Sequence, residues 1–195
     1  MFLLVLYVKF VAKMAYQNRL SSFLFKYNFV HKFQYKNSNK LPEIDRIVLN
    51  FGCRTNESSK LASNLVALKL LGDLNASLTV SKKPHIFFTI KRGSPSGCKL
   101  VLKGSPKGLF FLRRIFKFIL PRIKTFSGFD LKKNIQDKSF FFKIKDCFVF
   151  PEIERGYPFF WSLAELDIRV VFKNVNKSNE LKHTLLMIPS LLVTD

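Results

Sequence analysis

The sequence predicts an α+β fold in which helices pack on one face of an antiparallel-rich sheet and the open face of that sheet is basic. Segments with the period-two alternation of half-buried strands are interspersed with segments of helical periodicity. Of the 195 residues, 48% are hydrophobic, which supports a core and excludes a disordered basic chain. The formal net charge of +20 favours a nucleic acid or an anionic membrane surface as the partner.

Residues 1–40 are predicted to form a basic and apolar N-terminal extension, and residues 41–195 the folded domain. Met1–Ala12 is apolar but contains Lys9, and it is shorter than the roughly 20 residues of a spanning helix, so no stable membrane insertion is expected. Basic residues recur from Lys9 to Lys32, and no acidic residue precedes Glu43. This composition fits a signal-peptide core, an organelle import segment, a packing helix or an arm that docks on RNA or protein, and the arm is favoured.

The domain is expected to begin with a strand over Arg46–Phe51 that Gly52 ends. Its inward residues would be Ile47, Leu49 and Phe51, with Arg46, Val48 and Asn50 outward. A helix should follow, capped by Thr55 or Asn56 and stopped by Gly72, with Leu61, Leu65 and Leu68 facing the core. A short strand is expected at Leu78–Val80, broken by Lys82-Lys83-Pro84.

The stretch Lys91–Gly104, KRGSPSGCKLVLKG, predicts a hairpin. Phe87–Lys91 would be its first strand, Gly93–Gly97 its loop and Cys98–Lys103 its second strand. In the second strand Cys98, Leu100 and Leu102 point one way, and Lys99, Val101 and Lys103 point the other. One face of this hairpin is therefore apolar and the other basic, which suits a polyanion.

The second half of the domain continues the mixed pattern. Ser105-Pro106 begins a helix that Pro121 ends or kinks, with an apolar face of Leu112, Ile115, Phe116 and Ile119. The cations of that helix, Arg113, Arg114 and Lys117, fit a solvated face as well as a binding site. Strands are expected over Phe140–Phe150, with Lys143 and Lys145 on one face, and over Leu166–Lys173. A last helix follows a cap at Asn176–Ser178 and packs Leu181 and Leu185.

The sequence lacks the residue clusters that catalysis or metal binding requires. Cys53, Cys98 and Cys147 are odd in number and widely spaced, which indicates buried free thiols. The three histidines are equally scattered. Only the acid pairs Glu152/Glu154 and Glu165/Asp167 are candidates for a metal-dependent nuclease, and solvated charge near a strand end is the favoured interpretation. We therefore expect no enzyme, no cofactor and no metal site.

Five collinear segments of the chain resemble the large-subunit ribosomal protein family numbered five, the universal binder of 5S ribosomal RNA. FTIKRGSPSGCKLVLKG resembles the hairpin Phe-x-Ile-Arg-x-Gly-x-Pro-x-Gly-Cys-Lys of that family and is the most specific match. The five segments are Leu41–Gly52, Phe88–Gly104, Phe118–Phe129, Phe148–Ile153 and Leu166–Lys173. They are distributed in order across residues 41–173.

The resemblance implies a structural constituent of the large ribosomal subunit, placed in the central protuberance. It implies contacts with 5S rRNA, large-subunit rRNA, the P-site tRNA and neighbouring ribosomal proteins, including a head protein of the small subunit. With the basic faces of the predicted strands, the expected RNA-binding residues are Arg46, Asn50, Gly52, Lys82, Lys83, Lys91, Lys99 and Lys103. The loop expected to face the tRNA comprises Arg92, Gly93, Ser94, Pro95, Ser96 and Gly97.

The chain departs from the family pattern at several places. Asn134–Phe140 replaces a glycine-rich loop, Ser127 replaces an Arg before Gly128, and Ala164-Glu165 replaces Arg-Gly. This drift, together with the abundance of Phe, Lys and Asn, predicts a member from a mitochondrial ribosome, with a plastid as the alternative. The rival class is a basic membrane-surface protein anchored through residues 1–30.

Overall fold

The computed structural model describes residues 27–35, 37–53, 57–84, 86–88, 90–103, 106–124, 126–175, 178–186 and 193–194. The chain divides into two compact units, Met1–Pro42 and Glu43–Asp195. In the first unit, residues 27–33 are helical and Phe29 is fully buried, with its ring centroid 5.2 Å from that of Phe33. The predicted docking arm or import segment lies largely outside the described residues.

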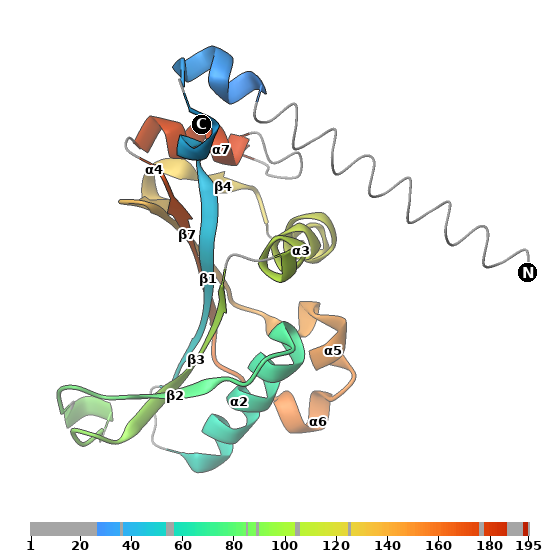
Figure 1. Ribbon diagram of the computed structural model, residues 1–195. Coiled ribbons are helices and arrows are strands. Elements are labelled where there is room, and N and C mark those ends of the chain that lie inside the picture. Colours follow the sequence, from blue (N-terminus) through green and yellow to red (C-terminus); the bar gives the residue numbers. More distant parts are fainter. Residues whose placement is uncertain are drawn as a thin grey trace, which may run out of the picture. The chain divides into compact units, whose positions relative to one another are not determined.

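The second unit is built on an antiparallel sheet, as the sequence predicts (Figure 1). Among the described residues this sheet has six strands in the order β2-β3-β1-β7-β6-β5. The strands are β1 (Glu43–Gly52), β2 (Ser77–Val80), β3 (Pro95–Lys103), β5 (Ile135–Gln136), β6 (Ser139–Ile144) and β7 (Leu166–Lys173). Two further short strands, β4 (Phe129–Asp130) and β8 (Val193–Thr194), pair in parallel. The α+β prediction is confirmed.

Strand β1 is central because it pairs with β3 on one side and with β7 on the other. Its predicted alternation is confirmed: Ile47, Leu49 and Phe51 are fully buried, and the residues between them are partly exposed. A shift in register between Ile44 and Arg46 adds Asp45 as an extra residue against β7. This bulge keeps Ile44 on the core side while Arg46 remains on the opposite side.

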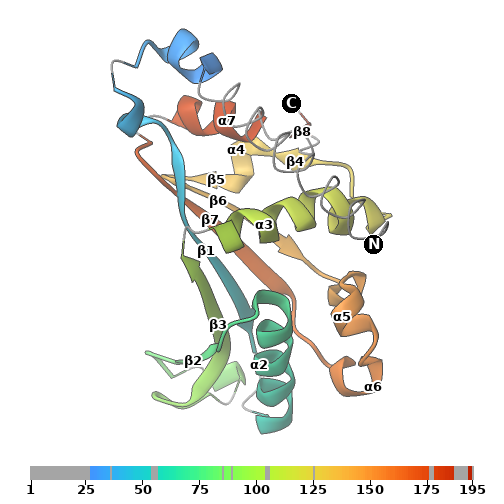
Figure 2. The same ribbon diagram turned by 45° about the vertical axis from the view of Figure 1, so that its right-hand side comes forward.

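Helices α2 (Ser58–Gly72), α3 (Pro106–Arg114), α5 (Pro151–Glu154) and α6 (Tyr157–Phe160) lie together on one side of the sheet, as both ribbon views show (Figure 1; Figure 2). In α2, Leu61 and Leu68 are buried, which confirms the predicted apolar stripe. The predicted N-cap of this helix is wrong, whereas the helix ends at Gly72 as predicted. Its N-cap is Glu57, and its C-cap is Asp73, whose φ of 53° is left-handed and whose N–H donates to the carbonyl of Lys69. Thr55 and Asn56 lie outside the described residues.

Helix α3 continues through a π-helical segment, η3 (Ile115–Ile119), into a 3-10 turn, η4 (Leu120–Arg122). Pro121 has no N–H and cannot donate to the carbonyl four residues earlier, so the α-helical pattern cannot pass through it. The π-helical segment replaces the α-helical hydrogen-bond pattern before the proline, because the N–H of Leu120 donates to the carbonyl of Ile115, five residues earlier. The predicted apolar face of this segment is confirmed, since Leu112, Ile115, Phe116 and Ile119 are all buried.

Strand β6 ends earlier than predicted. It stops at Ile144, and Cys147–Val149 forms a 3-10 turn (η5) whose N-cap, Asp146, accepts a hydrogen bond from Phe148 N at 2.9 Å. Lys145 therefore lies beyond the strand and does not share a strand face with Lys143. The segment Asn134–Phe140, which departs from the family pattern, begins at the last residue of the short helix α4 (Leu131–Asn134). It contains a two-residue turn between β5 and β6, in which Asp137 has a φ of 53°. The last helix, α7 (Ser178–Leu186), buries Leu181 and Leu185 as predicted.

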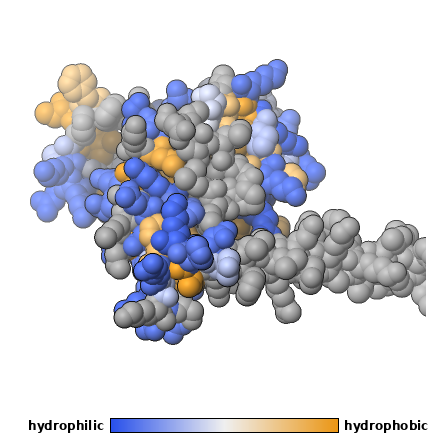
Figure 3. Space-filling model, turned by 90° about the horizontal axis from the view of Figure 1, so that it is seen from above, coloured by the Kyte–Doolittle hydropathy of each residue, from blue (hydrophilic) through white to orange (hydrophobic). Residues whose placement is uncertain are grey.

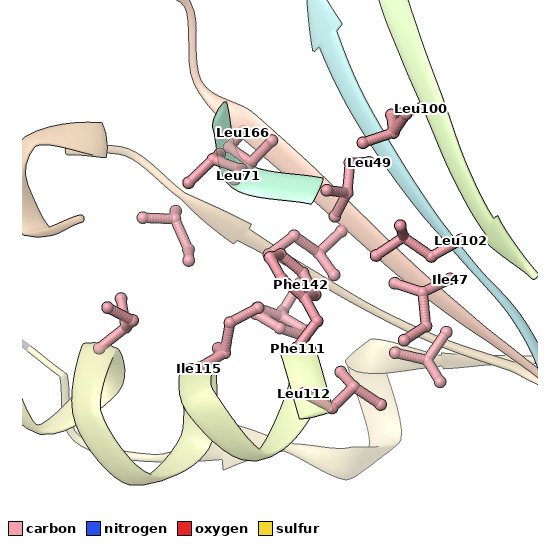
Figure 4. Packing of buried hydrophobic residues seen from close by; sticks show 14 of the residues in the cluster. Ile47, Leu49, Leu71, Leu100, Leu102, Phe111, Leu112, Ile115, Phe142 and Leu166 are labelled. Carbon is pink, nitrogen blue, oxygen red and sulfur yellow. The ribbon is translucent and has the colours of Figure 1, made fainter. Parts of the chain in front are cut away.

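One hydrophobic core fills the space between the sheet and the helices (Figure 4). In it, Phe111 and Ile115 of the α3–η3 segment face Phe142, and Leu71 of α2 lies near Leu166. A second part of this core is aromatic, with rings of Phe116, Phe129, Phe140 and Phe142 separated by 5.1 to 6.2 Å between centroids. These four phenylalanines are therefore part of the core.

The cysteines are free thiols, as predicted. Cys98 and Cys147 are buried, and burial raises the pKa of Cys98 to about 11 and that of Cys147 to about 12. Cys53 is half-buried, and desolvation raises its pKa although Asn64 donates a hydrogen bond to its sulfur at 2.8 Å.

Candidate nucleic-acid interface

The sheet face opposite the core is the candidate site, and its composition follows from strand alternation. Because β1, β3, β6 and β7 each bury every second residue, the residues between them form a second surface, which we call the open face. The exposed cations of the open face are Arg46, Lys99, Lys103, Lys143, Arg169 and Lys173. Its acidic residues within the described strands are Glu43 and Asp167, and Asp45 of the β1 bulge contacts Arg46 at this face.

Register places two of these cations directly opposite each other. Arg46 of β1 pairs with Lys103 of β3, and on its other side Arg46 pairs with the uncharged Val171. Asp45 lies 3.5 Å from the guanidinium of Arg46, but both side chains are about half exposed, so this ion pair is weak. Like charges at directly paired positions destabilise a sheet. An anion bound over Arg46 and Lys103 would relieve this repulsion.

A polar row crosses the middle of the open face. Lys99 pairs with Asn50, Asn50 with Asp167, and Asp167 with Lys143. Lys143 Nζ lies 3.2 Å from Asp167 Oδ1 and so neutralises that carboxylate. Asn50 is thereby left beside Lys99 as a neutral donor and acceptor, a combination that suits phosphate and 2′-hydroxyl groups.

The next row has no side chains on its two central strands. Gly52 of β1 pairs with Gly97 of β3, and Thr79 of β2 pairs with Gly97 on the other side. A Cβ on Gly52 would meet no atom within 4 Å, whereas a Cβ on Gly97 would lie 2.6 Å from the carbonyl oxygen of Phe51. The backbone of Gly52 is therefore exposed and a ligand can approach it closely, whereas Gly97 is buried against its neighbours.

The hairpin prediction is correct in its second strand and wrong in its first. β3 pairs with β2 (Ser77–Val80), while Ile86–Phe88 forms a 3-10 turn (η2). The predicted loop also ends sooner, since β3 begins at Pro95, and Ser96 and Gly97 lie in the strand. The loop between β2 and β3 is closed by hydrogen bonds from Ser81 N to Ser94 O and from Gly93 N to Ser81 O, both 2.9 Å long. Gly93 adopts a φ of 84°, which explains glycine there.

The structure thus divides the predicted site residues into three groups. Arg46, Asn50, Gly52, Lys99 and Lys103 share the open face. Lys82, Lys83, Lys91, Arg92, Gly93 and Ser94 lie in the β2–β3 loop, which projects away from α2 in both ribbon views (Figure 1; Figure 2). The third group, Pro95, Ser96 and Gly97, forms the start of β3 and connects the β2–β3 loop to the open face.

Sequence reasoning missed Lys143, Arg169 and Lys173 as members of the same surface. The alternation of β6 and β7 predicts that these side chains point outward. It does not predict that β7 pairs with β1, which is what brings them onto the same surface as Arg46 and Lys99. Arg169 is a direct partner of Val48 of β1 and of Phe141 of β6, so it lies in the middle of the sheet. The signal that could have found these residues is strand order, which local sequence does not contain.

The cationic character extends beyond the sheet. Residues 74–129 contain 12 Lys and Arg residues and no Asp or Glu. Among the coloured residues seen from above, hydrophilic ones predominate and hydrophobic ones form separate patches (Figure 3). Among Arg113, Arg114 and Lys117, Arg114 forms an ion pair with Glu152 of α5, and Lys117 lies 5.5 Å from the ring centroid of Phe118.

Two further findings concern the described residues only. They contain no group of three or more His, Cys, Asp or Glu side chains that could hold a metal ion. Within the same residues, no helix has both the length and the apolar character needed to cross a bilayer.

The fold and the open face define a class: α+β proteins that carry helices on one sheet face and exposed cations on the other. Comparison with known proteins identifies the family within that class. The chain is 32% identical over 150 residues to large ribosomal subunit protein uL5m of Reclinomonas americana, a match that covers 76% of this chain and 82% of the relative. No family model matches the chain.

Bacterial relatives match the chain with similar sequence identity and somewhat lower coverage. Large ribosomal subunit protein uL5 of Baumannia cicadellinicola subsp. Homalodisca coagulata is 32% identical over 127 residues, covering 64% of this chain and 70% of the relative. The uL5 protein of Buchnera aphidicola subsp. Baizongia pistaciae is 34% identical over 124 residues, covering 63% and 69%. The chain belongs to the uL5 family of large ribosomal subunit proteins. It is accordingly a structural ribosomal protein and not an enzyme.

Proposed function

We propose that the open face and the β2–β3 loop bind 5S ribosomal RNA in the central protuberance of the large subunit. The observation that carries this proposal is the direct pairing of Arg46 with Lys103 on a face that also exposes Lys99 and Arg169. A sheet that places cations opposite each other is best stabilised by a polyanion. Lys and Arg would neutralise phosphates, while Asn50 and the bare backbone at Gly52 would make the shape-dependent contacts typical of RNA recognition.

The β2–β3 loop and the start of β3, Arg92–Gly97, are proposed to face the P-site tRNA. Support comes from the projection of this loop away from the helices and from its exposed cations. A tRNA is a polyanion, so it fits the same electrostatic character as the neighbouring open face. Large-subunit rRNA, neighbouring ribosomal proteins and a head protein of the small subunit are the further partners in this proposal.

A salt titration tests the RNA proposal. The purified chain is titrated with 5S rRNA and with an unrelated folded RNA of equal length, at several salt concentrations. We expect tighter binding to 5S rRNA, with an affinity that falls steeply as salt rises because counterions are released on binding. Equal affinity for both RNAs would contradict 5S recognition and leave only general attraction to polyanions.

We also propose that the protein acts in a mitochondrial ribosome, with a plastid ribosome as the alternative, and that residues 1–40 dock on RNA or protein there. The similarity to the uL5m protein of Reclinomonas americana supports the first point. The seven Lys and Arg residues in residues 1–40, without any Asp or Glu, support the second. N-terminal sequencing of the protein from purified mitochondrial ribosomes tests both. A mature chain beginning near Leu41 would identify a cleaved import segment instead of an arm.

A further inference from the structure

The tip of the β2–β3 loop exposes two large hydrophobic side chains to an unusual degree. Ile86 is 92% exposed and Phe87 is 93% exposed. Both lie on the 3-10 turn η2, where they occupy adjacent positions. Hydrophobic side chains that project into water forgo the stabilisation that burial gives, and an exposed pair of this kind indicates a binding function.

The stem below this tip is held in place by hydrogen bonds. The hydrogen bonds that join Ser81 with Gly93 and Ser94 continue the β2–β3 ladder beyond the strands. Ser94 Oγ donates to the carbonyl of Lys91 at 2.7 Å, and Ser81 Oγ donates to the carbonyl of Lys83 at 2.5 Å. These hydrogen bonds order both sides of the stem from which the turn with Ile86 and Phe87 extends, which lowers the entropic cost of binding.

The surroundings of the tip are cationic. Lys82 and Lys83 precede the turn, and Lys91 and Arg92 follow it, all four exposed. The nearest acidic residues along the chain are Asp73 and Asp130. A ligand for this tip must therefore offer negative charge and an apolar surface within a few ångströms of each other.

We infer that Phe87, with Ile86 beside it, forms a stacking site for an unpaired base of RNA, while the four flanking cations hold the adjoining phosphates. This inference rests on the proposed function and deepens it. An unpaired nucleotide combines a phosphate with an exposed aromatic face, whereas the bases of a continuous duplex are stacked on each other. A phenylalanine ring accepts any base face, so the site selects unpaired nucleotides without a strict sequence preference.

The experiment compares two RNAs with equal numbers of phosphates: a hairpin with unpaired purines in its loop, and a fully paired duplex. The full chain and its Phe87→Ala variant are titrated with each RNA at the same salt concentration. We expect Phe87→Ala to weaken hairpin binding about tenfold and to leave duplex binding unchanged, because only the loop offers a base to stack. Phe87→Trp should retain hairpin binding.

Phe159→Ala is the matched control, since Phe159 is a second exposed phenylalanine, 54% exposed, on helix α6. It should bind both RNAs like the unmodified chain. A 2-aminopurine at an unpaired loop position provides a second readout, because stacking should quench its fluorescence with the unmodified chain and not with Phe87→Ala. Thermal unfolding of each variant verifies that the exposed substitution leaves the fold intact.

The possible results distinguish the stacking site at Phe87 from the proposed RNA-binding function on which it rests. Salt-dependent binding of both RNAs that Phe87→Ala does not alter would overturn the stacking site and leave the open-face proposal standing. Absence of salt-dependent binding to either RNA would overturn the proposed function itself. Binding of the unmodified chain to phosphatidylcholine and phosphatidylserine vesicles that Phe87→Ala abolishes, without a change in RNA affinity, would identify a lipid surface as the ligand and also overturn the inference.

Discussion

Gly97 lies against the backbone of Phe51 on the neighbouring strand: a Cβ at Gly97 would be 2.6 Å from the Phe51 carbonyl oxygen and 2.9 Å from Thr79 Oγ1. The three strands β2, β3 and β1 can therefore pair at their usual spacing only if this position has no side chain. The glycine sits in the segment that most specifically resembles the family, and packing explains its presence better than the loop in which it was predicted.

Gly97→Ala should consequently destabilise the protein. The clashing atoms include backbone, which cannot rotate away, so we expect a loss of about 1–3 kcal/mol in the free energy of unfolding. Urea denaturation measures it. Gly52→Ala is the matched control, because Gly52 is the direct register partner of Gly97 and has open space around it. That variant should unfold like the unmodified chain but bind 5S rRNA more weakly, and an equal loss of stability in both would contradict the packing argument.

Asn64 should be a second determinant of stability. It is fully buried, donates from Nδ2 to the Cys53 sulfur at 2.8 Å, and its Oδ1 lies 3.5 Å from the N–H of Ala164. Asn64→Ala removes both contacts and opens a small cavity, and we expect a loss of about 1–3 kcal/mol in the free energy of unfolding.

The neighbouring residue provides the comparison for Asn64. Ser63 is also buried, but its hydroxyl donates only to the carbonyl of Lys60 within the same helix, at 3.0 Å. Ser63→Ala should cost less than about 1 kcal/mol, since it breaks no contact between elements. If the two variants shifted the urea midpoint equally, the tertiary role assigned to Asn64 would be wrong.

Charge reversal on the open face and its loop should weaken RNA binding sharply. Lys91→Glu combined with Lys99→Glu is expected to lower the affinity for 5S rRNA at least tenfold and to reduce the salt slope by about 2, because two phosphate contacts are lost. Lys69→Glu with Lys117→Glu changes the net charge equally, and both positions are exposed on the helical side. An equal loss of affinity in this control pair would show that net charge, and not the open face, governs binding.

The pairing of Arg46 with Lys103 predicts an opposition between stability and binding. Lys103→Glu replaces a like-charge pair by an opposite-charge pair, so it should stabilise the free protein by about 0.2–1 kcal/mol. The same change should weaken RNA binding, since it removes a cation from the open face. The unfolding free energy of the unmodified chain should also rise with added salt more than that of the variant. A variant that is less stable than the unmodified chain would contradict this electrostatic account.

The reactivity of the three thiols should reflect their burial, and the two buried thiols should make stability depend on pH. Burial raises the pKa of Cys98 to about 11 and that of Cys147 to about 12, and it also shields both sulfurs from solvent. Only Cys53, which is half-buried, should therefore react with a thiol reagent in the native protein, although its pKa is raised too. All three should react in denaturant. Since both folded pKa values exceed the ordinary value of 9.0, the stability they contribute is present below pH 9 and is lost as the pH rises toward 11 and 12. Rapid reaction of all three thiols in the native state would contradict the packing around β3 and η5.

Much of the fold was predictable because alternation and helical periodicity are local. The inward and outward sets of β1, the apolar face of α3 and the Leu stripe of α2 were all predicted correctly. The errors fall where a contact distant in sequence decides the outcome. Phe87–Lys91 has strand composition, but β2 occupies the edge of β3, so this segment forms a loop and a 3-10 turn.

The sequence by itself determined the composition of each face: alternation separates apolar from basic residues within every strand, and the positive charge is independent of the fold. Only the tertiary structure decided which basic faces join. Strand order brings Arg169 beside Val48 and sets Arg46 opposite Lys103, and it gathers these residues on one surface although more than 60 positions separate Lys103 from Arg169 in the chain. The physical reason is that register and strand order depend on how complete hydrophobic faces pack together, a property of the whole core that no local segment contains.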